Sequence, residues 1–305
     1  MQVSTKQHGA HDLVDSYQDR SVQTQAEPPE KYVPYDKRKL SYSGTFTNPG
    51  KVYSIRAVEW LTGKFPLLRL IRKFEKAGVK EGREFFTQAL GFMGIDLITP
   101  QDNVDNIPAT GPLIVVANHP HGMVDGMVMA ELVGRKREDF LILTRSLISG
   151  IKEIKQFMLP VPFPHEADAL NEGLKMRKTA MAHLKAGGVI ILFPAGEVSS
   201  AKTWFGPAIE SDWNPFTAKM INRSGATVLP IYFPGQNSRL YLIADQISAT
   251  LRQGLLLHEV VHSLNKPQRP VVGKPIPAEE MKHWGANQRG FMAWLRDHTL
   301  ALKDL

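Results

Sequence analysis

The feature that most constrains the fold is an alternation beginning near residue 112, in which short apolar runs alternate with stretches of helical periodicity. The runs have the length of buried strands, and the stretches between them have the length and stop signals of helices. Such alternation is typical of a mostly parallel sheet covered by helices on both faces. The predicted strands are PLIVVA (112–117), FLIL (140–143), VIILF (189–193) and TVLPIYF (227–233), and the predicted helices span 122–133, 168–185, 215–223 and 285–303.

We therefore expect an α/β fold with one domain at 99–305, in which a mostly parallel central sheet is flanked by helices and a C-terminal helix closes the chain. Residues 1–48 are polar with little apolar periodicity, and we predict a flexible tail there. Residues 49–98 differ from both neighbours, and we predict amphipathic basic helices for the membrane surface.

Positive charge is concentrated in residues 51–83, which hold nine Lys or Arg against three Glu and thus six of the formal net charge of +7. Leu67, Leu70, Ile71 and Phe74 recur there at the spacing of one helix face. Two interpretations stay open: a helix lying in the membrane interface, or a surface helix packed on the core. The charge bias favours an anionic membrane surface as a partner, and we expect no nucleic acid partner.

Cysteine is absent, which excludes thiolate catalysis, a disulfide framework and cysteine-ligated zinc. No apolar segment of a secretory signal is visible at the N-terminus, and the longest apolar runs fall far short of the roughly 20 residues that span a bilayer. We expect a peripheral (monotopic) protein on the cytoplasmic face of the inner membrane.

Two predicted strands end in turns that carry ionisable side chains. The first strand runs into NHPHG and then Asp125, and VIILF runs into PAGEVSS. Reactive groups of parallel sheets gather beyond the carboxyl ends of the strands. His119 with Asp125 has the composition of a base and its orienting carboxylate, while Glu197 offers a second carboxylate beside Gly196. The alternative interpretation is that Asn118 and Asp125 are turn and cap residues and the histidines pack locally.

A third pattern, HEVVH at 258–262, has the spacing of a zinc-protease helix. On a helix it places two imidazoles on one face with Glu259 beside them. A zinc site needs a third ligand, but prolines interrupt the path to Glu279 and Glu280. Zinc hydrolysis through His258 and His262 stays a remote alternative, and we expect no metal site.

The ordered motifs resemble those of the glycerolipid acyltransferase superfamily, the PlsC-like lysophosphatidate acyltransferases. NHPHGMVDG is similar to the first family motif, FPAGEVSS to the third, and VLPIYF (228–233) to the fourth, proline-containing block. DWNPF (212–216) and GQNS (235–238) look like one bacterial branch, which holds hemolysin-like and lyso-ornithine-lipid (aminolipid) O-acyltransferases. The resemblance covers roughly residues 95–277, and it implies that 99–305 is an acyltransferase domain.

The resemblance implies an O-acyltransferase that moves a fatty acyl group from acyl-ACP or acyl-CoA to a lyso-lipid hydroxyl by direct transfer, without a cofactor. In the family the histidine of the first motif is the general base and the aspartate supports it, roles that map onto His119 and Asp125. The residues expected to bind substrate are Asn118, His121, Gly122, Gly196 and Glu197.

Two departures from the family pattern bear on the acceptor. Five residues separate His119 from Asp125, one more than usual, as in the aminolipid branch. AGEVSS lacks the arginine of the third motif, and none lies between Arg145 and Arg177, where the second motif supplies one. Because a phosphate monoester favours a guanidinium clamp, a lyso-aminolipid of ornithine-lipid type is favoured over lysophosphatidate, which stays the alternative.

The intact His–Asp pair argues against a third possibility, an inactive membrane-binding protein.

Overall fold

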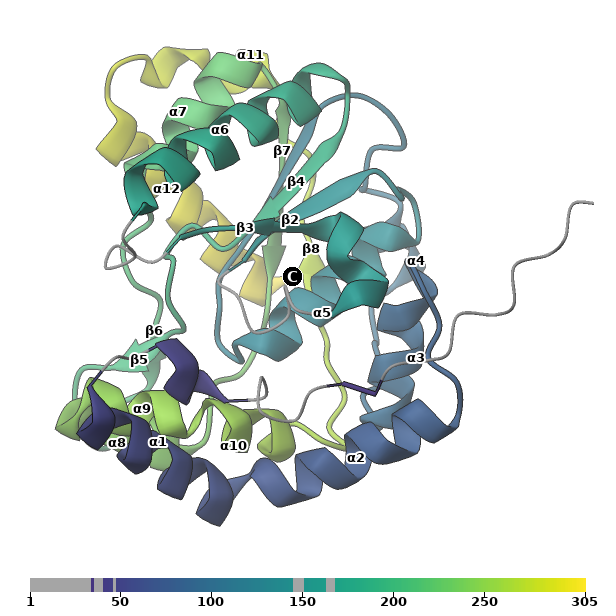
Figure 1. Cartoon of the computed structure of the whole chain (residues 1–305). Coiled ribbons are helices and arrows are strands. Elements are labelled where there is room, and N and C mark those ends of the chain that lie inside the picture. The colour runs from purple at the N-terminus through teal and green to yellow at the C-terminus, as the bar shows by residue number, and fades with distance from the viewer. Residues whose placement is uncertain (1–33, 36–40, 46–47, 145–150, 163–167) are drawn as a thin grey trace, which may run out of the picture. The chain divides into compact units, whose positions relative to one another are not determined.

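The computed structural model describes residues 34–35, 41–45, 48–144, 151–162 and 168–305, and Tyr35–Leu305 form one compact unit (Figure 1). The helices are α1 (Pro49–Thr62), α2 (Lys64–Lys76), α3 (Glu84–Phe92), α4 (Gln101–Val104), α5 (Met123–Gly134), α6 (Ala169–Lys185), α7 (Pro215–Ser224), α8 (Arg239–Ile247), α9 (Ala249–Gly254), α10 (Leu256–His262), α11 (Ala278–Met281) and α12 (Gln288–Leu300). The strands are β1 (Leu113–Ala117), β2 (Phe140–Thr144), β3 (Met158–Pro160), β4 (Val189–Leu192), β5 (Ser200–Ala201), β6 (Ala208–Ile209), β7 (Thr227–Tyr232) and β8 (Val271–Val272).

Within the described residues, six strands form one sheet in the order β3-β2-β4-β1-β7-β8. All neighbouring pairs are parallel except β7 with β8, so the predicted mostly parallel sheet is confirmed. β1 lies centrally, with Val115 opposite Ile191 of β4 and Leu229 of β7. The carboxyl ends of β1, β4 and β7 therefore meet at one edge of the sheet, where the site is built.

Both faces of the sheet are covered, as Figure 1 shows with α6, α7 and α12 on one side and α5 on the other. Along β1 the side chains alternate between two clusters, because successive residues of a strand point to opposite faces. Val115 belongs to the cluster that holds α3 and α5, and Val116 to the cluster that holds α6, α7 and α12. All of β1 is buried, which explains its uninterrupted apolar sequence.

The segment 49–98 is part of this core, which corrects the predicted boundary between a membrane segment and a separate domain at 99. Ile55 is fully buried, and Phe86 and Leu90 of α3 pack in the same cluster as β1. The predicted apolar stripe of α2 packs inward as well: Leu67 is buried, and Phe74 meets Phe85 edge to face at a centroid distance of 5.4 Å. The stripe therefore serves the core, as the second interpretation of this helix expected.

Part of the predicted tail is also fixed. Most of residues 1–48 lies outside the described residues, but Tyr42–Thr45 form a short 3₁₀-helix on α1. The buried carboxylate of Glu59 accepts hydrogen bonds from the Ser41 hydroxyl (2.6 Å) and the Tyr42 backbone N–H (2.8 Å). Burial raises the pKa of Glu59, although these bonds and Lys64 counteract it.

A further layer of helices joins the N-terminal pair to the rest of the unit. α1 contacts α9, and α2 contacts α10. At Gly63, between α1 and α2, an added Cβ would lie 2.8 Å from the Cα of His258, so the two backbones touch. In the part of the chain that the structure describes, every helix is too short or too polar to cross a bilayer.

Candidate active site

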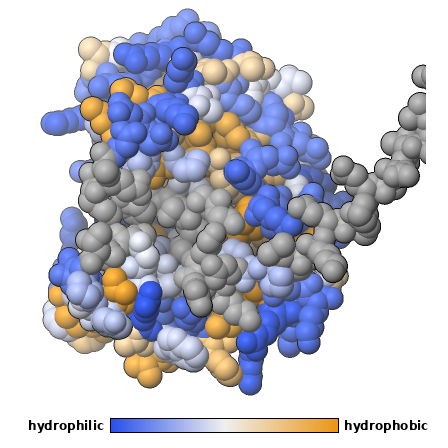
Figure 2. Space-filling view, in the orientation of Figure 1, coloured by the Kyte–Doolittle hydropathy of each residue, from blue (hydrophilic) through white to orange (hydrophobic). Residues whose placement is uncertain are grey.

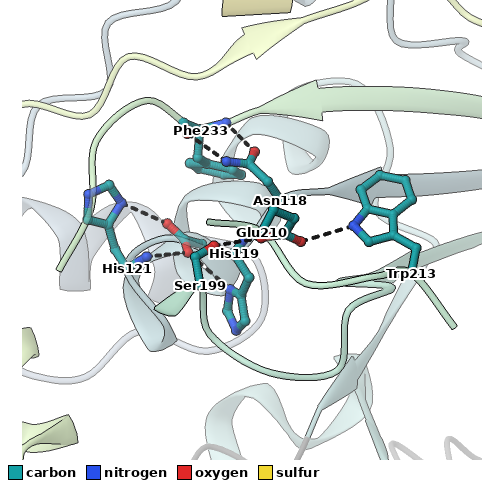
Figure 3. Close-up of polar contacts among 8 residues, drawn as sticks. Asn118, His119, His121, Ser199, Glu210, Trp213 and Phe233 are labelled. Carbon is teal, nitrogen blue, oxygen red and sulfur yellow. Dashed lines mark hydrogen bonds and ion pairs between the residues drawn. The ribbon is translucent and has the colours of Figure 1, made fainter. Parts of the chain in front are cut away.

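The turn after β1 and the start of α5 hold the first group of polar side chains (Figure 3). Gly122 has a φ of +69°, a left-handed conformation that favours glycine, and it lets the chain enter α5 within five residues of the strand. Asp125 then lies in the first turn of α5, where the helix dipole favours a negative charge.

His119 and Asp125 form the pair expected from the sequence. His119 Nδ1 lies 3.0 Å from Asp125 Oδ2, and the carboxylate is fully buried. Burial alone would raise the pKa of Asp125, but hydrogen bonds from His119 and His121 outweigh it and hold the pKa below its ordinary value. An ionised carboxylate only accepts hydrogen bonds, so Nδ1 of His119 carries a proton and donates it to Asp125 Oδ2.

His119 lines a cavity of about 470 Å³. Gly122, Gly196 and Glu197, all expected at the substrate, line the same cavity. Gly196 has a φ of +71°, and Glu197 accepts a hydrogen bond from the Ser211 hydroxyl at 2.7 Å. The two strand ends thus meet at one cavity.

His121 was expected to bind substrate, but it faces Asp125 and not the cavity. It is absent from the residues that line the cavity, and its side chain contacts the other oxygen of Asp125, with Nδ1 3.1 Å from Oδ1. Its backbone N–H also donates to Asp125 Oδ2 at 2.8 Å. The carboxylate is therefore shared by two histidines.

Asn118 was also expected at the substrate, but it does not line the cavity and its side chain bonds to the backbone. Its Nδ2 donates to the Phe233 carbonyl at 2.8 Å, and its Oδ1 accepts from the Phe233 N–H at 2.7 Å. This buried amide joins the end of β1 to the end of β7, across 115 positions of sequence, as Figure 3 shows. The sequence gives no sign of so distant a partner.

Glu210 is a functional candidate that the sequence analysis missed. Its buried carboxylate accepts from the His119 backbone N–H (3.1 Å), the Ser199 hydroxyl (2.6 Å) and Trp213 Nε1 (3.0 Å) (Figure 3). The Ser199 N–H in turn donates to the His119 carbonyl at 2.9 Å. Glu210 thereby fixes the backbone of His119 to the loop after β4. The available signal was an acid three residues before the tryptophan of DWNPF.

One wall of the cavity is apolar and another carries positive charge. The apolar wall lies between the sheet, α3 and α5 and includes Phe86, Met123, Met127, Ile142 and Met158. Arg177 and Arg252 also line the cavity, so guanidinium groups are present there although neither AGEVSS nor residues 146–176 contain an arginine. Arg252 pairs with Asp245 at 2.8 Å, whereas Arg177 lies over the ring of Phe216 and forms no ion pair with a described residue.

HEVVH lies on α10, and two of its side chains bond to neighbouring segments of the fold. Glu259 is buried and accepts from the Ser238 N–H (2.7 Å) and hydroxyl (2.6 Å). His258 Nδ1 contacts the Thr62 carbonyl at 3.0 Å, and His262 Nε2 lies 2.9 Å from the Lys266 ammonium, a neighbour that disfavours a divalent cation. Among the described residues no three His, Asp or Glu side chains are grouped so that they could hold a metal ion.

Comparisons with known proteins give one family model and several similar proteins. The model described as "Acyltransferase" matches residues 70–303. The lyso-glycine lipid O-acyltransferase of Phocaeicola vulgatus is 24% identical over 206 residues, covering 65% of this chain and 70% of that protein. The protein of the same name from Bacteroides thetaiotaomicron is 25% identical over 210 residues, covering 65% and 72%. The crystal structure of the 1-acyl-sn-glycerophosphate (LPA) acyltransferase PlsC from Thermotoga maritima is 14% identical, covers 86% of each chain and gives a TM-score of 0.47.

Proposed function

This chain belongs to the acyltransferase family, and from that premise we propose that it moves a fatty acyl group from an acyl thioester to the hydroxyl of a lyso-lipid, with His119 as general base. Family membership makes the protein an acyltransferase and confirms the resemblance found in the sequence. The observation that carries the mechanism is the position of His119, whose Nδ1 is held by the buried Asp125 while the ring lines the cavity.

In the proposed reaction Nε2 of His119 takes the proton of the acceptor hydroxyl as its oxygen attacks the thioester carbonyl. The imidazolium that forms is stabilised by the carboxylate of Asp125. The tetrahedral oxyanion then collapses, the carbon–sulfur bond breaks, and the leaving thiolate recovers the proton from His119. The products are an ester and a free thiol, and no covalent acyl-enzyme is needed.

We propose a lyso-aminolipid as the acceptor. Support comes from the two similar proteins named as lyso-glycine lipid O-acyltransferases and from the motifs shared with the aminolipid branch. The alternative, lysophosphatidate, now has an observation in its favour, because Arg177 offers the guanidinium that the sequence motifs lack. The absence of the motif arginines is therefore not an argument against an acceptor that carries a phosphate.

The experiment is an acceptor panel of lyso-glycine lipid, lyso-ornithine lipid and lysophosphatidate, tested with acyl-ACP and acyl-CoA and read by mass spectrometry. The proposal expects a lyso-aminolipid to be acylated fastest. Fastest acylation of lysophosphatidate, with a KM that rises in Arg177→Gln, would replace it with the alternative. Lys178→Gln, an exposed cation on the same helix outside the cavity, is the matched control.

We propose that the protein binds the cytoplasmic face of the inner membrane through the outer face of α1. The predicted stripe of α2 is buried, but Tyr53 (70% exposed), Trp60 (60%) and Leu61 (86%) lie at helical spacing on α1 and point outward. Phe65 of α2 is also exposed, with Arg69 4.4 Å over its ring. Figure 2 shows hydrophobic residues among hydrophilic ones along the lower edge, where Figure 1 draws α1. Exposed aromatic residues among basic ones are typical of interfacial surfaces.

A further inference from the structure

Asp125 is held by two imidazole rings, and the proposed reaction uses only one of them. His119 contacts Oδ2 at 3.0 Å, and His121 contacts Oδ1 at 3.1 Å. Figure 3 shows the two rings on different sides of the turn, joined by dashed lines to the same group. The second ring lies outside the cavity, so its place at the carboxylate is not explained by contact with substrate.

The ring of His121 fits only because a glycine lies next to it. Gly235 has a φ of +98°, and a Cβ there would lie 2.9 Å from His121 Nε2. In the side-chain orientation that satisfies both polar atoms of its amide, Asn237 would donate to the Pro120 carbonyl (3.3 Å) and to Glu259 Oε2 (3.2 Å). The loop after β7 therefore closes over His121 and ties the turn to α10.

Charged groups from several elements face His121. Asp125 of α5 is in direct contact, Glu259 and His262 belong to α10, and Lys266 follows that helix. Burial alone would lower the pKa of His121, but the hydrogen bond and charge of Asp125, aided by Glu259, outweigh burial and the repulsion of Lys266 and raise the pKa. His121 therefore takes up a proton more readily than an ordinary histidine.

We propose that His121 is a positioning residue whose protonation sets how much of the negative charge of Asp125 is available to His119. When His121 is neutral, the full charge of the carboxylate faces the ring of His119. When His121 is protonated, two imidazoles share that charge, and protonation of His119 is disfavoured. The two histidines then titrate as a coupled pair through one buried carboxylate.

This inference rests on the proposed function, because it concerns the same pair, but it makes a claim that needs no acyl transfer. The test is an NMR pH titration of the histidine Cε1–H signals in the full-length protein, with His119→Gln and His121→Asn used for assignment. Asparagine at 121 can still donate to Asp125 Oδ1 but carries no charge. His258→Asn, a change at a histidine bonded to a backbone carbonyl, is the matched control.

The expected result is two coupled transitions in the wild type and, in His121→Asn, a His119 transition displaced upward by roughly half a pH unit or more. The acidic limb of the kcat/KM profile should move by the same amount, with no such move in His258→Asn. Independent transitions in the wild type, a His121 that does not titrate, or an unmoved His119 transition in folded His121→Asn would overturn the proposal. If His121→Asn does not fold, His119→Gln still assigns the His119 signal, and the presence or absence of a second, coupled transition in that wild-type signal decides the question.

If the NMR coupling is found but no acyl transfer is detected with any acceptor, the proposed function fails while the inference stands. If acyl transfer is found and its acidic limb is the same in wild type and His121→Asn, the inference fails while the function stands.

Discussion

The imidazole of His119 lies flat against the ring of Phe193, with centroids 3.8 Å apart and planes inclined by 17°. The contact joins the two strand ends of the site, since His119 follows β1 and Phe193 follows β4. The aromatic face holds the ring plane, Asp125 fixes Nδ1, and an aromatic face also favours a ring that becomes positively charged. The proposed base is therefore oriented before any substrate binds.

His119→Ala is expected to lower the rate of acyl transfer roughly 10²–10⁴-fold, because the general base is removed. Asp125→Asn is expected to lower the rate in the same direction, since the imidazolium loses the charge that faces it. Initial rates with acyl-ACP and acyl-CoA, together with circular dichroism, separate chemistry from unfolding. Wild-type rates in folded His119→Ala protein would remove His119 from the reaction.

Glu210→Gln is expected to lower kcat roughly tenfold or more, because a neutral amide oxygen accepts more weakly than a carboxylate from the His119 N–H, and at least one of the three donors would face an amide N–H. The substitution would displace the backbone of His119 and leave the rest of the cavity in place. We therefore expect a large fall in kcat and a smaller change in the KM for the acceptor. Asp212→Asn, a change at an exposed acid two residues away, is the control. Equal kinetics in the two variants would show that Glu210 does not position the turn.

His258→Ala and His262→Ala are expected to keep most of the activity, and chelators should not inhibit, because neither ring lines the cavity. Glu259→Gln is expected to cost more stability than either, since it weakens the bonds to Ser238. Activity, bound zinc and melting temperature measure the three effects. Stoichiometric zinc that is lost with the activity on changing His258 or His262 would reinstate the metallohydrolase.

Trp60→Ser with Leu61→Ser is expected to weaken binding to anionic vesicles roughly tenfold or more. Each of these exposed apolar side chains adds favourable free energy of binding when it is buried in the membrane interface. Cosedimentation at low and high salt measures this, and the apolar contribution should persist when salt screens the charges. Leu170→Ser with Leu174→Ser, which changes exposed leucines of α6, is the control. Equal binding by both double variants would move the membrane surface away from α1.

The stability that His121 contributes should depend on pH with a defined sign. Its folded-state pKa is raised above the unfolded value of about 6.5, so its contribution is fully present below that value and is lost as pH rises through the folded-state pKa. Urea unfolding of wild type and His121→Asn between pH 5.5 and 8.5 measures the difference. The wild-type advantage should be largest at the acidic end, and an advantage that grows with pH would contradict the raised pKa.

The predictable part of the fold is the part with a strong local pattern. β1, β2, β4 and β7 are continuous apolar runs, and each was found, as were α5, α6, α7 and the closing α12. β5, β6 and β8 span two residues each, too few for a periodic signal. The stripe on α2 is compatible with lipid or with core, and tertiary contacts such as Phe74 with Phe92 decide between them.

The site divides in the same way. His119 and Asp125 were predictable because six positions along one turn bring them together. Asn118, His121 and Glu210 take their roles from residues far along the chain or on another loop: Phe233 for Asn118, the closing Gly235 for His121, and the His119 backbone for Glu210. Residue type fixed which groups could react, and tertiary structure fixed which of them face the cavity.

The backbone contact between Gly63 and His258 has a consequence for how a lipid would reach the site. Because the backbones of Gly63 and His258 leave no room for a methyl group between them, the junction of α1 and α2 packs directly on α10, within the compact unit that also holds His119. A bilayer that held α1 would then set the tilt of that unit above it. The height through which a lyso-lipid must rise from the bilayer to meet His119 would be a constant of the fold, where a flexible tether would leave it variable.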